Sequence, residues 1–156
     1  PSGYCGESKE NVYAGVGKLP TEAELNSAVS EWSRMQKALA PSKTKLDKFN
    51  TATVVYDART GQYYYGMNKG VKLSGDKLNS TLADILPEKS LNGYPLGNCA
   101  EVDAVNQALN NKANLNDLYM YTIETTPNSF GIPKPACENC TSTFRGKVAD
   151  IFSGHK

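Results

Sequence analysis

Three cysteines and one glutamate form the most chemically informative pattern in this 156-residue chain. Cys99 stands two residues before Glu101, and Cys137 and Cys140 form a Cys-x-x-Cys pair further along the chain. Catalytic zinc sites have three protein ligands and leave the fourth position of the metal to water, whereas structural sites close it with a fourth ligand. Three thiolates make zinc a weak Lewis acid, so a carboxylate base is needed to take the proton from water. The pattern predicts a catalytic zinc centre with three cysteine ligands and Glu101 as the general acid and base.

The spacing of these residues also indicates where two helices begin. Residues two apart on a regular helix point about 200° away from each other, so Cys99 must lie in the cap or first turn if Glu101 is to face the same metal. Cys137 and Cys140 share one face of a first turn, and Pro135 suits a helix entrance. We therefore expect the zinc ligands at two helix N-termini, where free amides and the helix dipole stabilise thiolates.

Other interpretations of the cysteines are weaker. Cys5 or His155 would complete a four-ligand site and make the chain a non-catalytic, zinc-stapled binding module, but both lie in terminal segments and neither explains Glu101. A thiol oxidoreductase would use the Cys-x-x-Cys pair and leave Cys99 and Glu101 unexplained. His155 is the sole histidine, which argues against Ser-His and Cys-His nucleophile mechanisms.

Composition predicts a single domain over residues 1–156, with residues 1–18 as a flexible arm. The net charge of +1 gives no general attraction to nucleic acid or anionic membrane, so a polyanion would have to be held by local contacts. Apolar runs are too short to cross a bilayer, and no segment resembles a signal peptide. The chain starts at Pro1, as expected of a domain excised from the C-terminal part of a longer protein.

The elements that must position the site follow an α/β order. Thr21 opens a helix to about residue 40 with a capping box, and its predicted buried stripe is Leu25, Ala28, Val29, Trp32, Met35, Gln36 and Leu39. Residues 51–58 and 62–67 are expected to form a β-hairpin, in which the three consecutive tyrosines of the second strand alternate between the two faces. Residues 118–124 are expected to form a central strand that is covered on both faces. Helices are expected from residue 98 or 99, and from 135–137 through residue 148. Arg34, Lys37 and residues 42–48 form a basic cluster typical of a solvated linker.

Cys99-Ala100-Glu101, followed by Pro135-Ala136-Cys137-Glu138-Asn139-Cys140, resembles the signature of the cytidine-deaminase-like zinc deaminases. The longer segment from Asn98 to Leu109 and the Cys-Glu-Asn-Cys motif are similar to the corresponding sequences of the YwqJ-like branch of these deaminases. Members of this branch occur as C-terminal domains of bacterial polymorphic toxins. The resemblance covers about residues 51–152. It departs from the family pattern where Ala136 separates Pro135 from Cys137.

The resemblance implies a three-layer α-β-α sandwich with a mixed sheet, and a hydrolytic deaminase that converts cytosine to uracil in nucleic acid, with DNA favoured. An adenine deaminase or a free-nucleoside deaminase is the alternative. It implies that Cys99, Cys137 and Cys140 hold Zn²⁺, that Glu101 moves the proton, and that the amide of Ala100 or Cys137 stabilises the oxyanion. Implied partners are single- or double-stranded DNA or RNA and a cognate immunity protein. The domain would act as a monomer in the cytoplasm of a target cell after delivery from the producing bacterium.

Three further residues are candidates for substrate contact. In related deaminases an asparagine after the second strand contacts the sugar or base, and Gly66-Met67-Asn68 matches that position, although a turn asparagine is an equal alternative. Tyr94 and Phe130 lie in the two loops expected to flank the pocket, where an aromatic face can stack on a base.

Overall fold

The computed structural model describes residues 19–40, 42, 49–68, 78–87 and 99–154. A four-stranded sheet forms its centre, in the order β2-β1-β3-β4. The strands are β1 (Thr51–Asp57), β2 (Gln62–Met67), β3 (Leu118–Glu124) and β4 (Asp150–Ile151). The helices are α1 (Glu22–Ala38), α4 (Ser80–Ile85), α5 (Ala100–Asn110) and α6 (Glu138–Phe144), with a short 3₁₀ helix at Leu115–Asp117.

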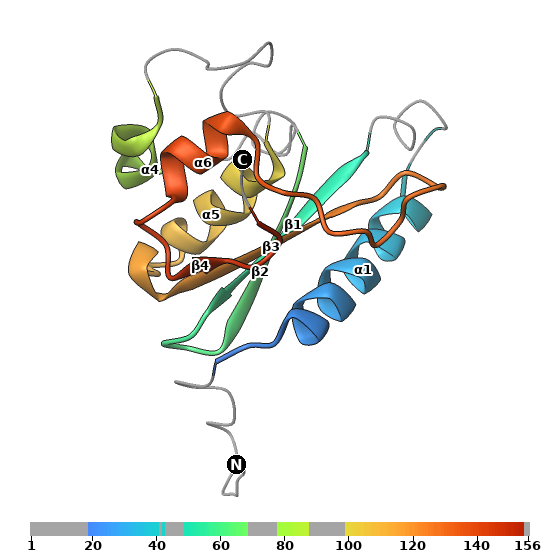
Figure 1. Ribbon diagram of the computed structural model, residues 1–156, viewed down its shortest axis with the longest axis horizontal. Coiled ribbons are helices and arrows are strands. Elements are labelled where there is room, and N and C mark those ends of the chain that lie inside the picture. Colours follow the sequence, from blue (N-terminus) through green and yellow to red (C-terminus); the bar gives the residue numbers. More distant parts are fainter. Residues whose placement is uncertain (1–18, 41, 43–48, 69–77, 88–98, 155–156) are drawn as a thin grey trace, which may run out of the picture.

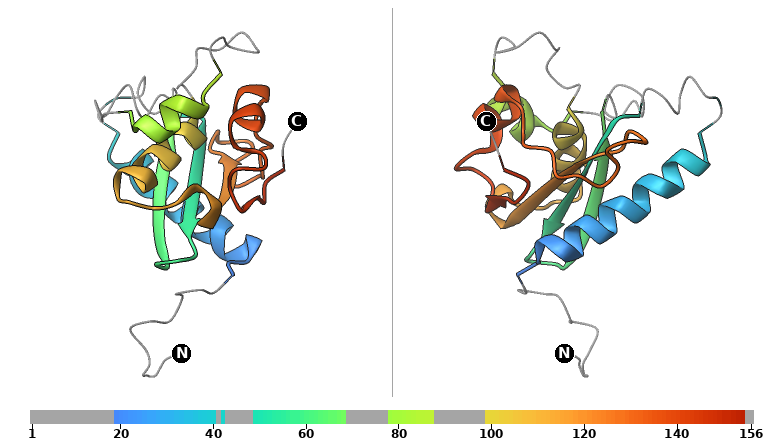
Figure 2. Two further views of the ribbon diagram at one scale, coloured as in Figure 1. Left: turned by 90° about the vertical axis from the view of Figure 1, so that its left-hand side faces the viewer. Right: turned by 45° about the vertical axis from the view of Figure 1, so that its right-hand side comes forward.

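The elements are arranged in three layers. Helix α1 covers one face of the sheet, and α4, α5 and α6 lie on the other (Figure 1; Figure 2, left). The expected α-β-α sandwich is therefore confirmed. Within the described residues, no helix is long and apolar enough to cross a membrane.

The sheet is mixed, as expected. β1 pairs antiparallel with β2 and with β3, which confirms the predicted hairpin, and β3 pairs parallel with β4. The sequence did not predict β4, because a two-residue strand carries no periodicity and is defined only by its pairing with Tyr119 and Met120. The predicted third helix is also shorter than expected, since α6 ends at Phe144.

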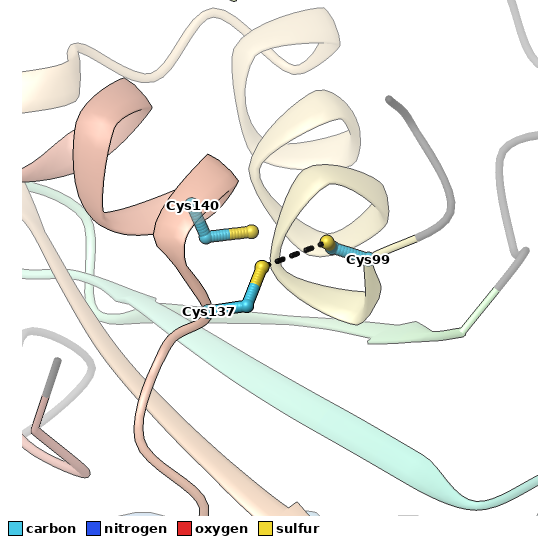
Figure 3. A group of neighbouring side chains, drawn as sticks. All are labelled: Cys99, Cys137 and Cys140. Carbon is cyan, nitrogen blue, oxygen red and sulfur yellow. Dashed lines mark hydrogen bonds between the residues drawn. The ribbon is translucent and has the colours of Figure 1, made fainter. Parts of the chain in front are cut away.

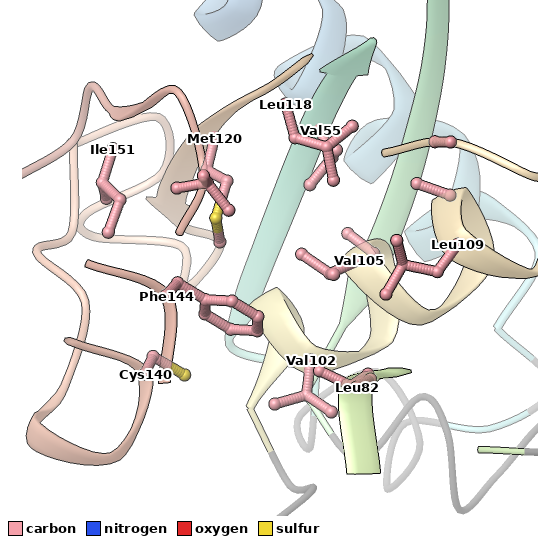
Figure 4. Close-up of a cluster of buried hydrophobic side chains, with 14 of the residues drawn as sticks. Val55, Leu82, Val102, Val105, Leu109, Leu118, Met120, Cys140, Phe144 and Ile151 are labelled. Atoms are coloured by element: carbon pink, nitrogen blue, oxygen red, sulfur yellow. The ribbon is translucent and has the colours of Figure 1, made fainter. Parts of the chain in front are cut away.

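Side chains alternate across β3 as predicted for a central strand. Leu118 and Met120 belong to the apolar cluster on the α5 side, and Tyr121 and Ile123 belong to the cluster on the α1 side. Figure 4 shows the α5-side cluster, where Phe144 of α6 approaches Val102 and Val105 of α5. This shared core holds the two helices that carry the cysteines against one sheet face.

The three tyrosines of β2 also alternate as predicted. Tyr63 and Tyr65 pack on the α1 side and Tyr64 packs on the α5 side. Trp32 of α1 stacks on Tyr65, with ring centroids 5.4 Å apart and planes within 8° of parallel. Trp32 is thus a packing residue, as a tryptophan at helical spacing usually is.

The capping box of α1 is present, but part of its predicted stripe was wrong. The Glu24 amide donates to Thr21 Oγ1 and the Thr21 amide donates to Glu24 Oε1, both at 3.1 Å. Met35 and Leu39, predicted to be buried, are 57% and 74% exposed. The buried face instead continues from Val29 to Ser33, and Met35 lies about 200° around the helix from Ser33. Ser33 is tolerated inside because its hydroxyl donates to the Val29 carbonyl.

Helix α5 approaches the end of β2 very closely, and this contact positions the start of the helix. A Cβ atom added at Gly66 would lie less than 3.0 Å from backbone atoms of Ala100 and Ala104. Asp103 accepts a 2.9 Å hydrogen bond from the Met67 amide. Gln107 donates to the Tyr65 carbonyl at 2.7 Å. The glycine is therefore required for close backbone packing.

Candidate active site

The three predicted ligand side chains come together at the N-termini of α5 and α6. Their Sγ atoms all lie within 4.8 Å of one another, and the Cys99 and Cys137 sulfurs are 3.5 Å apart (Figure 3). Cys99 is the N-cap of α5 and Cys137 is the N-cap of α6, with Cys140 in the first turn. The expected helix starts are confirmed.

These distances fit metal coordination and exclude a disulfide in this arrangement. A disulfide needs an S–S separation of about 2.05 Å. A tetrahedral zinc with Zn–S bonds of about 2.3 Å separates its sulfur ligands by about 3.8 Å, close to the 3.5 Å between Cys99 and Cys137. Three cysteines in this geometry could hold a metal ion, and the thiolate donors suit zinc.

The sulfurs share their protons unequally. Hydrogen bonds from the Cys140 and Cys99 thiols hold the pKa of Cys137 well below its usual value, and the backbone amides of Cys140 and Asn139 act in the same direction. A hydrogen bond to Cys137 raises the pKa of the Cys99 thiol to about 12. The Cys140 thiol has its own hydrogen bond to Cys137, and this bond together with burial raises the pKa of Cys140. A metal ion would replace the protons on these two thiols.

Glu101 lies in the first turn of α5 and is only 5% exposed. Burial raises the pKa of Glu101 to about 7, and the charge on Cys137 adds to this effect. Its own backbone amide, the Thr122 hydroxyl and the Lys134 ammonium oppose the shift. A carboxyl group with a pKa near neutrality beside a potential metal site is suited to transfer protons in both directions.

Two polar residues that act on Glu101, Thr122 of β3 and Lys134 of the following loop, are held in place by hydrogen bonds to other residues. Thr122 pairs with Thr53 across β3 and β1, their hydroxyl oxygens 2.7 Å apart. Lys134 donates to the Thr51 hydroxyl at 2.8 Å and pairs with Glu124 at 3.1 Å. Neither Thr122 nor Lys134 stands out in the sequence, because threonine is an ordinary strand residue and a loop lysine carries no motif.

The predicted substrate residues have different environments. Asn68 Oδ1 accepts hydrogen bonds from the Asn50 and Thr51 amides at 3.1 and 3.2 Å, and these bonds hold the start of β1 in place. Ala100 is buried at the start of α5. Phe130 lies in a pocket beside α1 whose lining includes neither the three cysteines nor Glu101. Tyr94 lies outside the described residues, and the substrate roles of all four stay predictions.

The potential fourth ligands also fall outside the part of the chain that the structure describes. Cys5 and His155 belong to its undescribed ends. Among the described residues, the cluster able to hold a metal contains Cys99, Cys137 and Cys140 alone. That part of the chain offers a metal three cysteine ligands, and the open, catalytic site predicted from the sequence stays a prediction.

Comparison of the sequence with known proteins identifies the family of this chain. The chain is 25% identical over 144 residues to Toxin YwqJ of Bacillus subtilis (strain 168), an alignment that covers 83% of this chain and 24% of that protein. The chain thus spans about a quarter of the length of that curated relative. No solved structure matches the chain significantly. The YwqJ-like deaminase profile matches residues 37–148, a segment that includes the three clustered cysteines and Glu101. The chain belongs to the YwqJ-like deaminase family.

Proposed function

We propose that this domain is a zinc-dependent hydrolase that deaminates a nucleobase, with cytosine in DNA as the favoured substrate. One observation carries the proposal: three cysteine sulfurs converge at two helix N-termini beside a buried glutamate that is electrostatically coupled to each of them. Membership in a deaminase family supports the same chemistry.

Cys99, Cys137 and Cys140 would hold the zinc ion, which when bound supplies Lewis acidity and lowers the pKa of water. The two helix N-termini offset the negative charge of three thiolates, each by roughly 0.3–1 kcal/mol or more where partly buried. The amide of Ala100 or Cys137 is available to stabilise the oxygen that becomes negative at the attacked carbon.

Glu101 would carry the proton through the reaction. It takes a proton from the attacking water and gives it to the ring nitrogen, and then assists proton transfer to the leaving amine. Water and cytosine yield uracil and ammonia, so a C–O bond forms as the exocyclic C–N bond breaks. A pKa of about 7 allows Glu101 both to accept and to return a proton near neutral pH. A hydrogen bond from the Thr122 hydroxyl favours the ionised form of this carboxylate.

The same chemistry serves an adenine in nucleic acid or a free nucleoside, which are the alternatives to cytosine in DNA. Mass spectrometry of bases after incubation with single-stranded DNA, duplex DNA, RNA and free nucleosides separates these substrates. We favour a nucleic-acid substrate, since the curated relative is a toxin. By the same reasoning we propose that the domain acts as a monomeric effector inside a target cell and is neutralised by a cognate immunity protein.

Glu101→Gln tests the assigned role. The amide retains the shape of the side chain and cannot act as a base, so deamination should fall by roughly 10²- to 10⁴-fold while zinc content stays at the wild-type level. Glu138→Gln is the matched control, because Glu138 is an exposed glutamate between two of the cysteines. Base analysis gives turnover and elemental analysis gives the zinc content. Unreduced turnover in Glu101→Gln, or no converted base from zinc-loaded wild-type protein, would reject the proposal.

A further inference from the structure

A pocket opens beside α1, at the end of the sheet where β1 begins and β3 ends. Its volume is about 470 Å³. The lining includes Arg34 and Lys37 from α1, Phe49 before β1, and Thr125, Pro127 and Phe130 after β3. Figure 1 shows the segment after β3 passing along α1 before it returns to α6. The mechanism proposed above does not use this pocket.

The pocket combines two fixed cations with aromatic walls. The Arg34 guanidinium lies 5.2 Å from the centroid of the Phe130 ring, and the Lys37 ammonium lies 5.3 Å from that of Phe49. Lys37 also donates to the Phe49 carbonyl at 3.2 Å. Among the residues that the structure describes, no carboxylate pairs with either cation and no acidic residue lines the pocket. Two cations held over aromatic rings favour a ligand that is both anionic and aromatic.

The pocket and the cysteine site lie toward the same end of the strands, on opposite faces of the sheet, because α1 covers one face and α5 and α6 cover the other. Thr125 follows Thr122, the hydrogen-bonding partner of Glu101, by three residues, which is about 10 Å of strand. On the neighbouring strand, Phe49 precedes Thr51, whose hydroxyl accepts a hydrogen bond from Lys134. The pocket and the polar surroundings of Glu101 therefore share one end of β1 and β3.

We propose that this pocket binds a neighbouring nucleotide of a single-stranded polynucleotide substrate, its base against the Phe130 ring and its phosphates against Arg34 and Lys37. This inference rests on the proposed nucleobase deaminase function. A net charge of +1 provides no general attraction to a polyanion, so the strand requires local cations of this kind. Single strands fit better than duplexes because their bases expose a stacking face.

The test is a binding measurement on the full chain. A fluorescent single-stranded DNA oligonucleotide of mixed sequence, and its RNA counterpart, are titrated with Glu101→Gln protein, which prevents turnover. In this background Arg34→Gln and Lys37→Gln are introduced together, and Phe130→Ala separately. Fluorescence anisotropy at several salt concentrations gives the affinity and its salt dependence, and thermal melting confirms that each variant is folded.

The double charge variant should weaken binding roughly tenfold or more and reduce the slope of log affinity against log salt by about 1.4, since each phosphate contact contributes about 0.7 on a single strand. Phe130→Ala should weaken binding roughly 5- to 150-fold through lost stacking. If Phe130→Ala does not fold, the charge variant decides. Arg59→Gln is the matched control, because Arg59 follows β1 at the opposite end of the strand and pairs with Asp117.

The inference would be overturned if the folded pocket variants bound the oligonucleotides with the same affinity and the same salt dependence as the Glu101→Gln protein. It would also be overturned if the variants lost binding of an immunity protein and kept binding of the oligonucleotides. An absence of oligonucleotide binding in a protein that deaminates free nucleosides would overturn it as well, while the proposed function stands. Pocket-dependent oligonucleotide binding without any base conversion would support the inference and reject the proposed function.

Discussion

Replacing Gly66 with alanine should weaken both the fold and metal binding, because this glycine lets β2 touch the first turn of α5. The added Cβ would lie 2.5 Å from the Ala100 carbonyl oxygen, whereas ordinary contacts begin at 3.4 Å. The start of α5 must therefore move by roughly 1 Å, and overpacking of this kind typically costs about 1–3 kcal/mol. For a domain of this size, such a loss lowers the melting temperature by roughly 2–12 °C.

The same displacement should reach the site, since Ala100 lies between Cys99 and Glu101 in the chain. Misplacing catalytic groups by about 1 Å can reduce turnover by about 10²-fold. Zinc affinity, measured by competition with a chelator, should fall along with the melting temperature measured by circular dichroism.

Gly146→Ala is the control for this experiment. Gly146 has φ of 80°, so alanine strains the backbone there, but nothing lies within 4 Å of the added Cβ. It should lower the melting temperature and leave zinc affinity unchanged. If Gly66→Ala matches wild type in both measurements, or loses stability without losing zinc affinity, the claim that this contact positions the metal site is refuted.

Two further predictions concern the ligands and the buried carboxyl group. Cys140→Ser should reduce zinc affinity by more than the 10- to 100-fold that is typical of losing a hydrogen bond to a metal ligand. The control, Thr141→Ser, should not reduce zinc affinity to this extent. Competition with a chelator measures both affinities, and equal values for the two variants would show that Cys140 is not a zinc ligand. Because the pKa of Glu101 is raised from 4.5 to about 7 on folding, the folded metal-free chain binds this proton more tightly than the unfolded chain. Its stability should therefore fall by up to about 3 kcal/mol as pH rises from about 4.5 to about 7. Urea denaturation of metal-free protein should show this loss in wild type and its reduction in Glu101→Gln; equal pH profiles would contradict the assigned pKa.

The sequence alone determined the features that depend on neighbouring residues. The spacing of Cys99 and Glu101 required a helix to begin at that point, and Cys99 is the N-cap of α5. The capping box at Thr21, the hairpin and the alternation along β3 were likewise predictable, because each is a property of a few consecutive side chains. The convergence of the three cysteines was predictable for a related reason, since cysteines at such spacing have few uses apart from metal binding.

Tertiary structure decided the features that join distant parts of the chain. Local periodicity placed Leu25, Val29 and Met35 on one stripe of α1, whereas packing buries Leu25 and Val29 and leaves Met35 exposed. Strand β4 exists only because the chain returns beside Tyr119 and Met120. Neither outcome was predictable from periodicity, because burial depends on the surface against which a segment packs.

The same limit applies to the surroundings of the site. Thr122 and Lys134 affect Glu101 from more than twenty residues away, and Arg34 meets Phe130 from almost a hundred. Arg34 and Lys37 fit a solvated basic cluster in the sequence, yet folding placed both beside aromatic rings at one end of the sheet. Local sequence specifies which side chains can perform chemistry, while long-range packing determines which of them meet, because contacts between distant residues form only when the sheet and its helices assemble.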